Sequence, residues 1–230
     1  MTAQDFAASL VANLVASGVE SFYLSPGARS QALAIAAEQL ASAGKAKLTV
    51  RLDERSMAFT ALGNALASGK PVAVITTSGT AVANLHPAVL EAFHAGIPLI
   101  LLTADRPARL RGKGANQTTL QQGIFAGGTV AEFDLEADDP EVAAKFAHSA
   151  VLAAVNKQGP VQLNLQFDLP LSSASPTATE VFANLDSHPP VGAGDLAELE
   201  VPVDDHTVVI AGAGGEGARE FAEKAGLPLL

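Results

Sequence analysis

Glu54 is a residue whose type and position point to chemistry. It lies where a predicted strand, residues 48–52, meets a predicted helix, beside Asp53 and Arg55. A carboxyl group that projects from a strand end into a crevice can share a proton with a ligand nitrogen. A carboxylate in the first turn of a helix also interacts favourably with the helix dipole, without any ligand. The local sequence alone is compatible with both roles.

A second candidate is the turn at residues 76–80, which supplies hydroxyl groups and one glycine. It follows the apolar stretch 71–75 and precedes a helical pattern that runs to about residue 95. A turn at the carboxyl end of a parallel strand directs backbone N–H groups into the crevice where open α/β sheets bind ligands. A well-capped helix start with no ligand fits the same residues.

Two arginines occupy positions where a positive charge needs a reason. Arg29 begins a predicted helix over residues 29–43, where a cation opposes the helix dipole, and Arg106 follows a predicted strand over residues 97–103. Either could bind a carboxylate, and either could be a solvated surface residue. The long segment 104–123 has no clear periodicity, and loops of that length in compact domains are usually functional or mobile.

Composition excludes several classes of function. The chain has 230 residues, no cysteine and a net charge of −10, so disulfides and thiolate chemistry are excluded and a broad nucleic-acid-binding surface is disfavoured. The five histidines lack the spacing of a helical metal pair, and no metal site is predicted within the chain. With no signal-peptide pattern and no apolar segment long enough to span a bilayer, we expect a cytoplasmic protein without membrane insertion.

Predicted strands and helices alternate along the chain. The strands fall at residues 21–24, 48–52, 71–75, 97–103, 129–133 and 161–167, most of them followed by a helical pattern. Parallel strands need crossover connections, which helices provide. The fold class predicted is therefore α/β, a doubly wound, mostly parallel sheet with helices on both faces.

The sequence predicts three segments: an α/β domain over residues 1–168, a linker rich in Ser, Pro, Ala and Gly over 169–203, and the truncated start of a second α/β domain over 204–230. Residues 212–217 match a dinucleotide-binding glycine pattern. The acidic residue expected about 20 positions later would fall beyond Leu230, and glycine-rich turns without a nucleotide are common, so a turn without a nucleotide is favoured. A non-catalytic nucleotide-binding module therefore stays an alternative.

Several motifs in one order and spacing resemble a single family, the 2-succinyl-5-enolpyruvyl-6-hydroxy-3-cyclohexene-1-carboxylate (SEPHCHC) synthases. These are thiamine-diphosphate enzymes of menaquinone biosynthesis, and the resemblance extends from the N-terminus to about Phe167. The segments that carry it are residues 25–30 (Ser-Pro-Gly-Ala-Arg-Ser), 53–55 (Asp-Glu-Arg), 77–84 (Thr-Ser-Gly-Thr-Ala-Val-Ala-Asn), 102–107 (Leu-Thr-Ala-Asp-Arg-Pro) and 114–117 (Gly-Ala-Asn-Gln).

The resemblance implies a transferase that decarboxylates 2-oxoglutarate and adds the remaining unit to isochorismate. It implies that Glu54 is catalytic, hydrogen-bonding N1′ of the aminopyrimidine of thiamine diphosphate. The cofactor-binding residues that it implies are Pro26, Glu54, Thr80 and Asn84. The residues that it implies for the substrate carboxylates and hydroxyls are Arg29, Arg106, Asn116 and Gln117.

Two departures from the family limit what the resemblance carries over. Many relatives have Ser where this chain has Ala28, so that hydroxyl contact is not expected here. Thiamine-diphosphate enzymes hold the diphosphate and Mg²⁺ through a C-terminal domain of a partner subunit, and that domain is missing from these residues. We therefore expect at least a homodimer, and no turnover from the 230 residues alone. Another thiamine-diphosphate decarboxylase or synthase stays open as an alternative.

Overall fold

The structure is a computed structural model that describes residues 2–173, 177–187, 200–212, 215 and 217–230. It divides into two units, residues 1–193 and residues 194–230. The larger unit carries every motif of the family resemblance.

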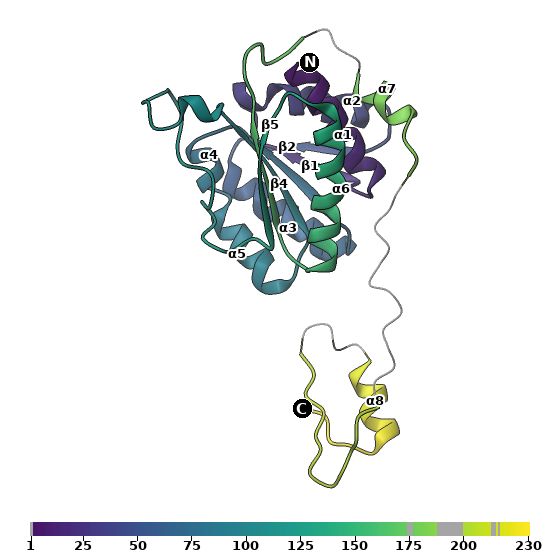
Figure 1. Ribbon diagram of the computed structural model, residues 1–230. Coiled ribbons are helices and arrows are strands. Elements are labelled where there is room, and N and C mark those ends of the chain that lie inside the picture. Colours follow the sequence, from purple (N-terminus) through teal and green to yellow (C-terminus); the bar gives the residue numbers. More distant parts are fainter. Residues whose placement is uncertain (1, 174–176, 188–199, 213–214, 216) are drawn as a thin grey trace. The chain divides into compact units, whose positions relative to one another are not determined.

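The larger unit is built on a six-stranded sheet in which all neighbouring strands are parallel (Figure 1). Its strands are β1 (Ser21–Leu24), β2 (Lys47–Val50), β3 (Val72–Thr76), β4 (Leu99–Asp105), β5 (Ala131–Glu136) and β6 (Val161–Gln166). They lie in the order β2-β1-β3-β4-β6-β5. The chain leaves β1 toward β2 on one side and later returns to β3 on the other. A doubly wound sheet forms its ligand crevice at such a point.

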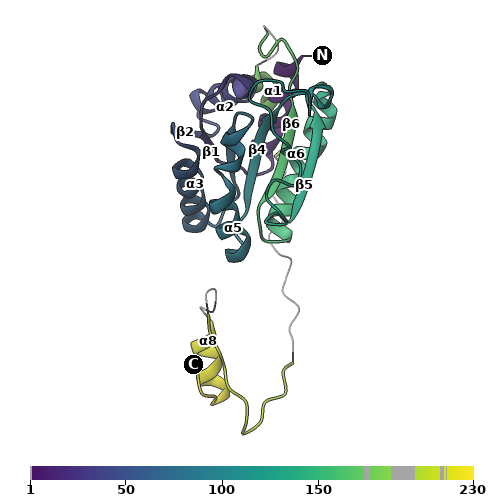
Figure 2. The same cartoon turned by 90° about the vertical axis from the view of Figure 1, so that its left-hand side faces the viewer.

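Helices cover both faces of this sheet, as the two views in Figures 1 and 2 show. One face packs against α1 (Ala3–Ala16), α2 (Gln31–Ser42), α6 (Pro140–Asn156) and α7 (Ala178–Ala183). The other packs against α3 (Glu54–Ser68), α4 (Thr80–Ala83) and α5 (His86–Ala95). The predicted doubly wound α/β fold is thus confirmed.

The central strands are buried along their whole length. Every residue of β3, β4 and β6 is buried, because helices cover both faces there. Successive side chains alternate between two cores: Phe22 and Leu24 pack with the first, and Tyr23 packs with the second. This double coverage accounts for the near-continuous apolar sequence of β3.

The helix predicted over residues 80–95 is two helices, and the expectation of one continuous helix is wrong. The chain forms α4 up to Ala83, turns at Asn84 and Leu85, and begins α5 at His86. Pro87 lies in the first turn of α5. Because proline has no N–H and clashes with the preceding turn, it suits a helix start and interrupts a helix interior. The predicted helix from Arg29 likewise begins as a 3-10 turn, Ala28–Ser30, before α2.

The segment from 169 to 203, expected to be a linker, contains a packed helix. Thr177 and Glu180 form a capping box at the start of α7, and Ala178 is fully buried. The Ala178 N–H donates to Gln39 Oε1 at 2.9 Å, which ties α7 to α2. Residues 174–176 and 188–199 of this segment lie outside the described residues.

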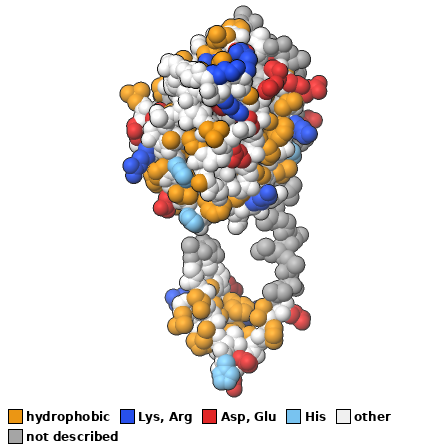
Figure 3. Space-filling view, turned by 60° about the vertical axis from the view of Figure 1, so that its left-hand side comes forward, with side chains coloured by type: hydrophobic (Ala, Val, Ile, Leu, Met, Phe, Trp, Pro, Cys, Tyr) orange, Lys and Arg blue, Asp and Glu red, His pale blue; other side chains and the backbone are white. Residues whose placement is uncertain are grey.

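The smaller unit contains one helix, α8 (Ala218–Ala225), and a parallel bridge between Val209 and Leu229 among its described residues. The strand predicted from residue 207 is present only as that bridge in the part of this unit that the structure describes. Large apolar side chains of this unit, including Ile210, Phe221 and Leu230, are exposed, and Figure 3 shows hydrophobic side chains gathered on its surface. Three residues of the glycine pattern 212–217 lie outside the described residues, so the pattern stays a prediction.

A helix that crosses a bilayer needs about 20 predominantly apolar residues. In the part of the chain that the structure describes, no helix is long and apolar enough to cross a membrane.

Candidate functional site

Most of the predicted site residues lie in the segments that follow the carboxyl ends of four neighbouring strands. In sheet order, these are Glu54 after β2, Pro26 and Arg29 after β1, Thr80 and Asn84 after β3, and Arg106 after β4. Because all four strands are parallel, their carboxyl ends lie at one edge of the sheet. The fold therefore gathers residues that are up to 80 positions apart in sequence.

Glu54 is the first residue of α3. Asp53 caps the helix, with its carboxylate accepting from the Ser56 N–H at 2.7 Å. The side chain of Glu54 is half-buried and has no hydrogen-bond or ion-pair partner among the described residues. Since Asp53 already satisfies the helix end, the Glu54 carboxylate is available to a ligand donor at the crevice.

The turn after β1 is held by its neighbours on both sides. The Ser25 hydroxyl donates to Arg51 O at 2.9 Å, and the Ser25 N–H donates to Ile75 O at 3.0 Å. These bonds connect the ends of β2, β1 and β3. The exposed Pro26 is thereby fixed at the strand edge next to the turn after β3.

Gly27 is required by the close approach of these two turns. A Cβ at Gly27 would lie 2.3 Å from Thr77 Cβ and 2.5 Å from Thr77 Cγ2. We therefore expect Gly27→Ala to lower the free energy of unfolding by about 1–3 kcal/mol, the usual cost of overpacking. Chemical denaturation of the 230-residue chain measures this change in the free energy of unfolding.

Gly63→Ala is the matched control, because a Cβ at Gly63 has no neighbour within 4 Å and the residue lies inside α3. It should raise stability by about 0.5–1 kcal/mol. The double variant Gly27→Ala with Thr77→Gly should recover part of the loss. Equal stabilities for Gly27→Ala and the wild type would refute the close approach.

The turn after β3 is buried up to Gly79, where α4 begins. Thr77 and Ser78 are buried, and Gly79 has a left-handed φ of 83°. Thr80 and Asn84, at the two ends of α4, are exposed, and their side chains have no hydrogen-bond partners among the described residues. The turn thus presents two unengaged polar side chains at the point where the sheet order reverses.

Arg29 and Arg106 bring two positive charges to the same region. Arg29 Nη1 donates to Phe167 O at 2.9 Å, while its buried Nε has no partner among the described residues. Arg106 Nη1 donates to Ser78 Oγ and Gln117 O, both at 2.6 Å. Burial, followed by the charge of Arg106, lowers the pKa of Arg29. Two cations held this close favour the binding of an anion.

The loop after β4 brings Gln117 to this group. Gln117 has a left-handed φ of 53°, and its Nε2 donates to Ser78 O at 3.1 Å. The Asn116 side chain is exposed and has no hydrogen-bond partner within the part of the chain that the structure describes. The structure therefore connects Gln117 with Arg106 both directly and through Ser78, and among the described residues it shows no such contact for Asn116.

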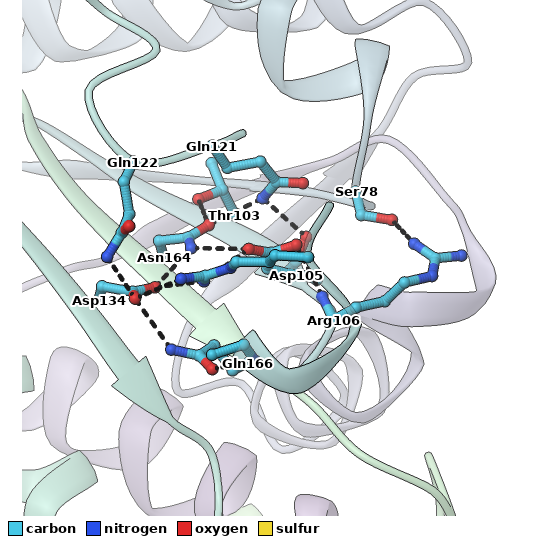
Figure 4. A network of polar contacts seen from close by, with 12 residues as sticks. Ser78, Thr103, Asp105, Arg106, Gln121, Gln122, Asp134, Asn164 and Gln166 are labelled. Carbon is cyan, nitrogen blue, oxygen red and sulfur yellow. Dashed lines mark hydrogen bonds and ion pairs between the residues drawn. The ribbon is translucent and has the colours of Figure 1, made fainter. Parts of the chain in front are cut away.

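Beneath this loop lies a buried polar cluster that the sequence motifs do not include. Arg111 binds both the fully buried Asp105, at 2.8 Å, and Asp134 of β5, through two bonds of 2.8 Å. Asn164 donates to the same two carboxylates, as Figure 4 shows. Burial opposes ionisation of Asp134, but the hydrogen bonds from Arg111, Asn164 and Gln166 outweigh it, so the pKa of Asp134 lies below its ordinary value.

One sequence signal for this cluster exists in β6. Gln162, Asn164 and Gln166 recur at every second residue, so their side chains lie on one face of a central strand. A polar row on a buried face needs polar partners. The partners come from β4, from the loop after it and from β5, so this loop packs against the sheet.

The structure also bears on metal binding by this chain. Within the described ranges, no group of three or more His, Asp or Glu side chains is arranged to hold a metal ion.

Comparison with protein families finds a match to this chain. Residues 4–124 match the model of the thiamine pyrophosphate enzyme N-terminal TPP binding domain. The matched range includes Glu54 and the turns after β1, β3 and β4.

Curated relatives match nearly the whole chain. A protein of Leifsonia xyli named SEPHCHC synthase is 48% identical, over 99% of this chain and 40% of its own length. A protein of the same name from Paenarthrobacter aurescens is 42% identical, over 100% of this chain and 43% of its own length. The chain therefore spans less than half the length of these relatives.

A solved structure has the same fold. The thiamine diphosphate-dependent 4-hydroxybenzoylformate decarboxylase of Rhodococcus jostii superposes with a TM-score of 0.59 at 16% identity, covering 80% of this chain and 34% of that enzyme. At this identity the likeness concerns the fold alone.

Proposed function

The chain belongs to the thiamine pyrophosphate enzyme family, and from that premise we propose that it forms the pyrimidine side of a SEPHCHC synthase. The complete protein would decarboxylate 2-oxoglutarate and add the remaining unit to isochorismate. The observation that carries the proposal is the pair Arg29 and Arg106 at the strand edge that also holds Glu54, whose carboxylate has no partner among the described residues. Two dianionic substrates require fixed cations beside the cofactor.

The residues of this chain fit the pyrimidine end of thiamine diphosphate. Three polar side chains at the crevice, those of Glu54, Thr80 and Asn84, have no partner among the described residues and so are free to bind a ring with nitrogen donors and acceptors. When bound, the cofactor supplies the chemistry that stabilises a carbanion after loss of carbon dioxide. Glu54 would hold the proton at N1′ of the ring, and Pro26 would contact the ring.

The remaining cofactor contacts are assigned to parts of the complete protein outside this chain. We place the diphosphate and Mg²⁺ ligands there, together with a homodimeric assembly in which a partner subunit completes the site. Relatives named as this synthase are more than twice as long as the matched range, which leaves room for such a domain.

The arginines act on substrate carboxylates. Arg29 and Arg106 repel each other, and a bound carboxylate between them would relieve that repulsion. Arg106 Nη1 donates to Ser78 and Gln117, so the other N–H groups of its guanidinium are available to a ligand. Gln117 and Asn116 would provide amide groups for the hydroxyl and carboxylate oxygens of isochorismate.

A chimera tests the proposal. This chain would replace the matched 40% of the Leifsonia xyli relative, giving a protein of full length, here called the chimera. With thiamine diphosphate and Mg²⁺, we expect mass spectrometry to find the adduct only when 2-oxoglutarate and isochorismate are both present. The 230-residue chain alone should give none. If the chimera released as much carbon dioxide from pyruvate or benzoylformate as from 2-oxoglutarate and formed no adduct, it would instead be a different decarboxylase.

A further inference from the structure

Gln121 is a fully buried glutamine whose side chain joins three elements of the fold. Its Oε1 accepts from the Gly79 N–H at 2.9 Å, at the start of α4. Its Nε2 donates to Ala104 O of β4 at 3.2 Å and to Asn164 Oδ1 of β6 at 2.8 Å. Figure 4 shows Gln121 above Thr103 and Asn164, within the polar network.

The orientation of the Gln121 amide is fixed by these partners. A backbone N–H can only donate, so the oxygen must face Gly79, and a carbonyl can only accept, so the nitrogen must face Ala104. Asn164 cannot rotate to change this arrangement without loss, because its own Nδ2 donates to Asp105 and Asp134. The side chain therefore presents one acceptor to the turn after β3.

The Gly79 N–H depends on this acceptor. Gly79 is the buried N-cap of α4, and among the described residues its N–H donates only to Gln121 Oε1. A buried donor without a partner is costly, so without Gln121 the turn would shift to find another acceptor. The next residue, Thr80, and Asn84 one turn later would move with it.

We infer that Gln121 is a positioning residue that sets α4, and with it Thr80 and Asn84, against the cofactor ring. This inference rests on the function proposed above. Gln121 itself does not reach the crevice, because its side chain is enclosed by Gly79, Ala104 and Asn164. Its effect on the ligand therefore passes through the backbone of the turn.

The first test needs no activity. In the 230-residue chain, NMR hydrogen exchange should show a slow Gly79 amide, and Gln121→Leu should speed it at least about tenfold and shift the amide signals of Thr80 and Asn84. Gln122→Leu is the matched control, because Gln122 is exposed and its side chain donates to Asp134 rather than to the turn. Unchanged signals from Gly79 to Asn84 in Gln121→Leu would overturn the inference.

The second test separates positioning from stability. In the chimera, Gln121→Leu should raise the thiamine diphosphate concentration that gives the half-maximal rate about tenfold. The concentration of the substrate 2-oxoglutarate that gives the half-maximal rate should rise less. A folded variant with wild-type cofactor dependence would refute the positioning role. If the wild-type chimera forms no adduct, the proposed function fails, and the amide measurement still decides whether Gln121 sets the turn.

A conservative variant guards against misfolding. Gln121→Glu keeps an oxygen toward Gly79, and at about pH 5.5 a buried carboxyl is protonated and can donate to Asn164. At that pH we expect a slow Gly79 amide in Gln121→Glu and a fast one in Gln121→Leu. If the Gly79 amide exchanged equally fast in both variants, the role of the Gln121 oxygen would be refuted.

Discussion

Replacing Glu54 by glutamine is expected to lower the rate of the chimera by about 10²–10⁴-fold, the range that a positioned proton-transfer group contributes. Glutamine has nearly the same shape but cannot hold a proton at N1′ of the ring. Stability should change by less than about 1 kcal/mol, because the Glu54 carboxylate has no partner among the described residues and interacts only with the helix end. Steady-state kinetics and thermal unfolding measure the two quantities.

Glu141→Gln is the matched control for this change. Glu141 also lies in the first turn of a helix, α6, behind an Asp cap, and it is exposed. Both substitutions remove one negative charge from a helix N-terminus, so a shared loss of rate would indicate a general electrostatic effect. A near-normal rate for Glu54→Gln would remove Glu54 from the mechanism.

The local parts of the fold could be predicted from the sequence because their causes are local. Apolar β-branched runs, such as residues 71–75, and helix caps, such as Asp53 before α3, each involve residues close together in the chain. Alternating strands and helices then leave few topologies, since parallel strands need crossovers. This topology also fixes where the strands end, so Glu54 and the turn after β1 lie at one edge of the sheet.

The break between α4 and α5 had a local signal that the helical periodicity outweighed. Pro87 cannot donate to residue 83, and its ring crowds the preceding turn. The apolar residues Val82, Leu85 and Val89 keep helical spacing across the break because all three pack into the same core. The helical spacing of these residues therefore correctly indicated that they are buried, but it wrongly predicted one continuous helix.

The loop after β4 could not be predicted, because its path depends on contacts between distant residues. Gln121 and Asn164 are 43 positions apart, and Ser78 and Gln117 are 39 apart. Long-range hydrogen bonds leave no period in the local sequence, so Arg106 and Gln117 could be named as site residues while the groups that hold them could not. Ser78 holds both residues, while Asp105, Asp134 and Asn164 hold the rest of the loop through Arg111 and Gln121.

Replacing Arg111 by methionine is the change expected to cost the most stability in this loop. Arg111 is the cation that neutralises Asp105, whose side chain is fully buried, and Asp134, whose side chain is 17% exposed. Removing one partner of a buried ion pair leaves an uncompensated charge and typically costs about 3–5 kcal/mol. Denaturant unfolding of the 230-residue chain should show a loss of this size.

Arg109→Met provides the matched control. Arg109 is two residues away and pairs with Asp168, but both side chains are more than half exposed. An exposed pair contributes less than about 1 kcal/mol, so Arg109→Met should change stability little. Equal losses in the two variants would show that the burial of Asp105 does not set the cost. Adding Asp105→Asn to Arg111→Met should recover part of the loss, because it removes the unpaired charge.

The pH dependence distinguishes an unpaired charge from a simple loss of packing. In the wild type the pKa of Asp134 is lowered, so its contribution to stability is present above the ordinary Asp pKa of about 3.9 and is lost as the pH falls through the lowered value. Without Arg111, burial raises the pKa of the Asp134 carboxyl, and the variant then gains stability on acidification from neutral pH. The difference in unfolding free energy between wild type and Arg111→Met should therefore narrow as the pH falls toward about 4. A difference that stays constant over that range would mean that Arg111 holds the loop by packing rather than by charge.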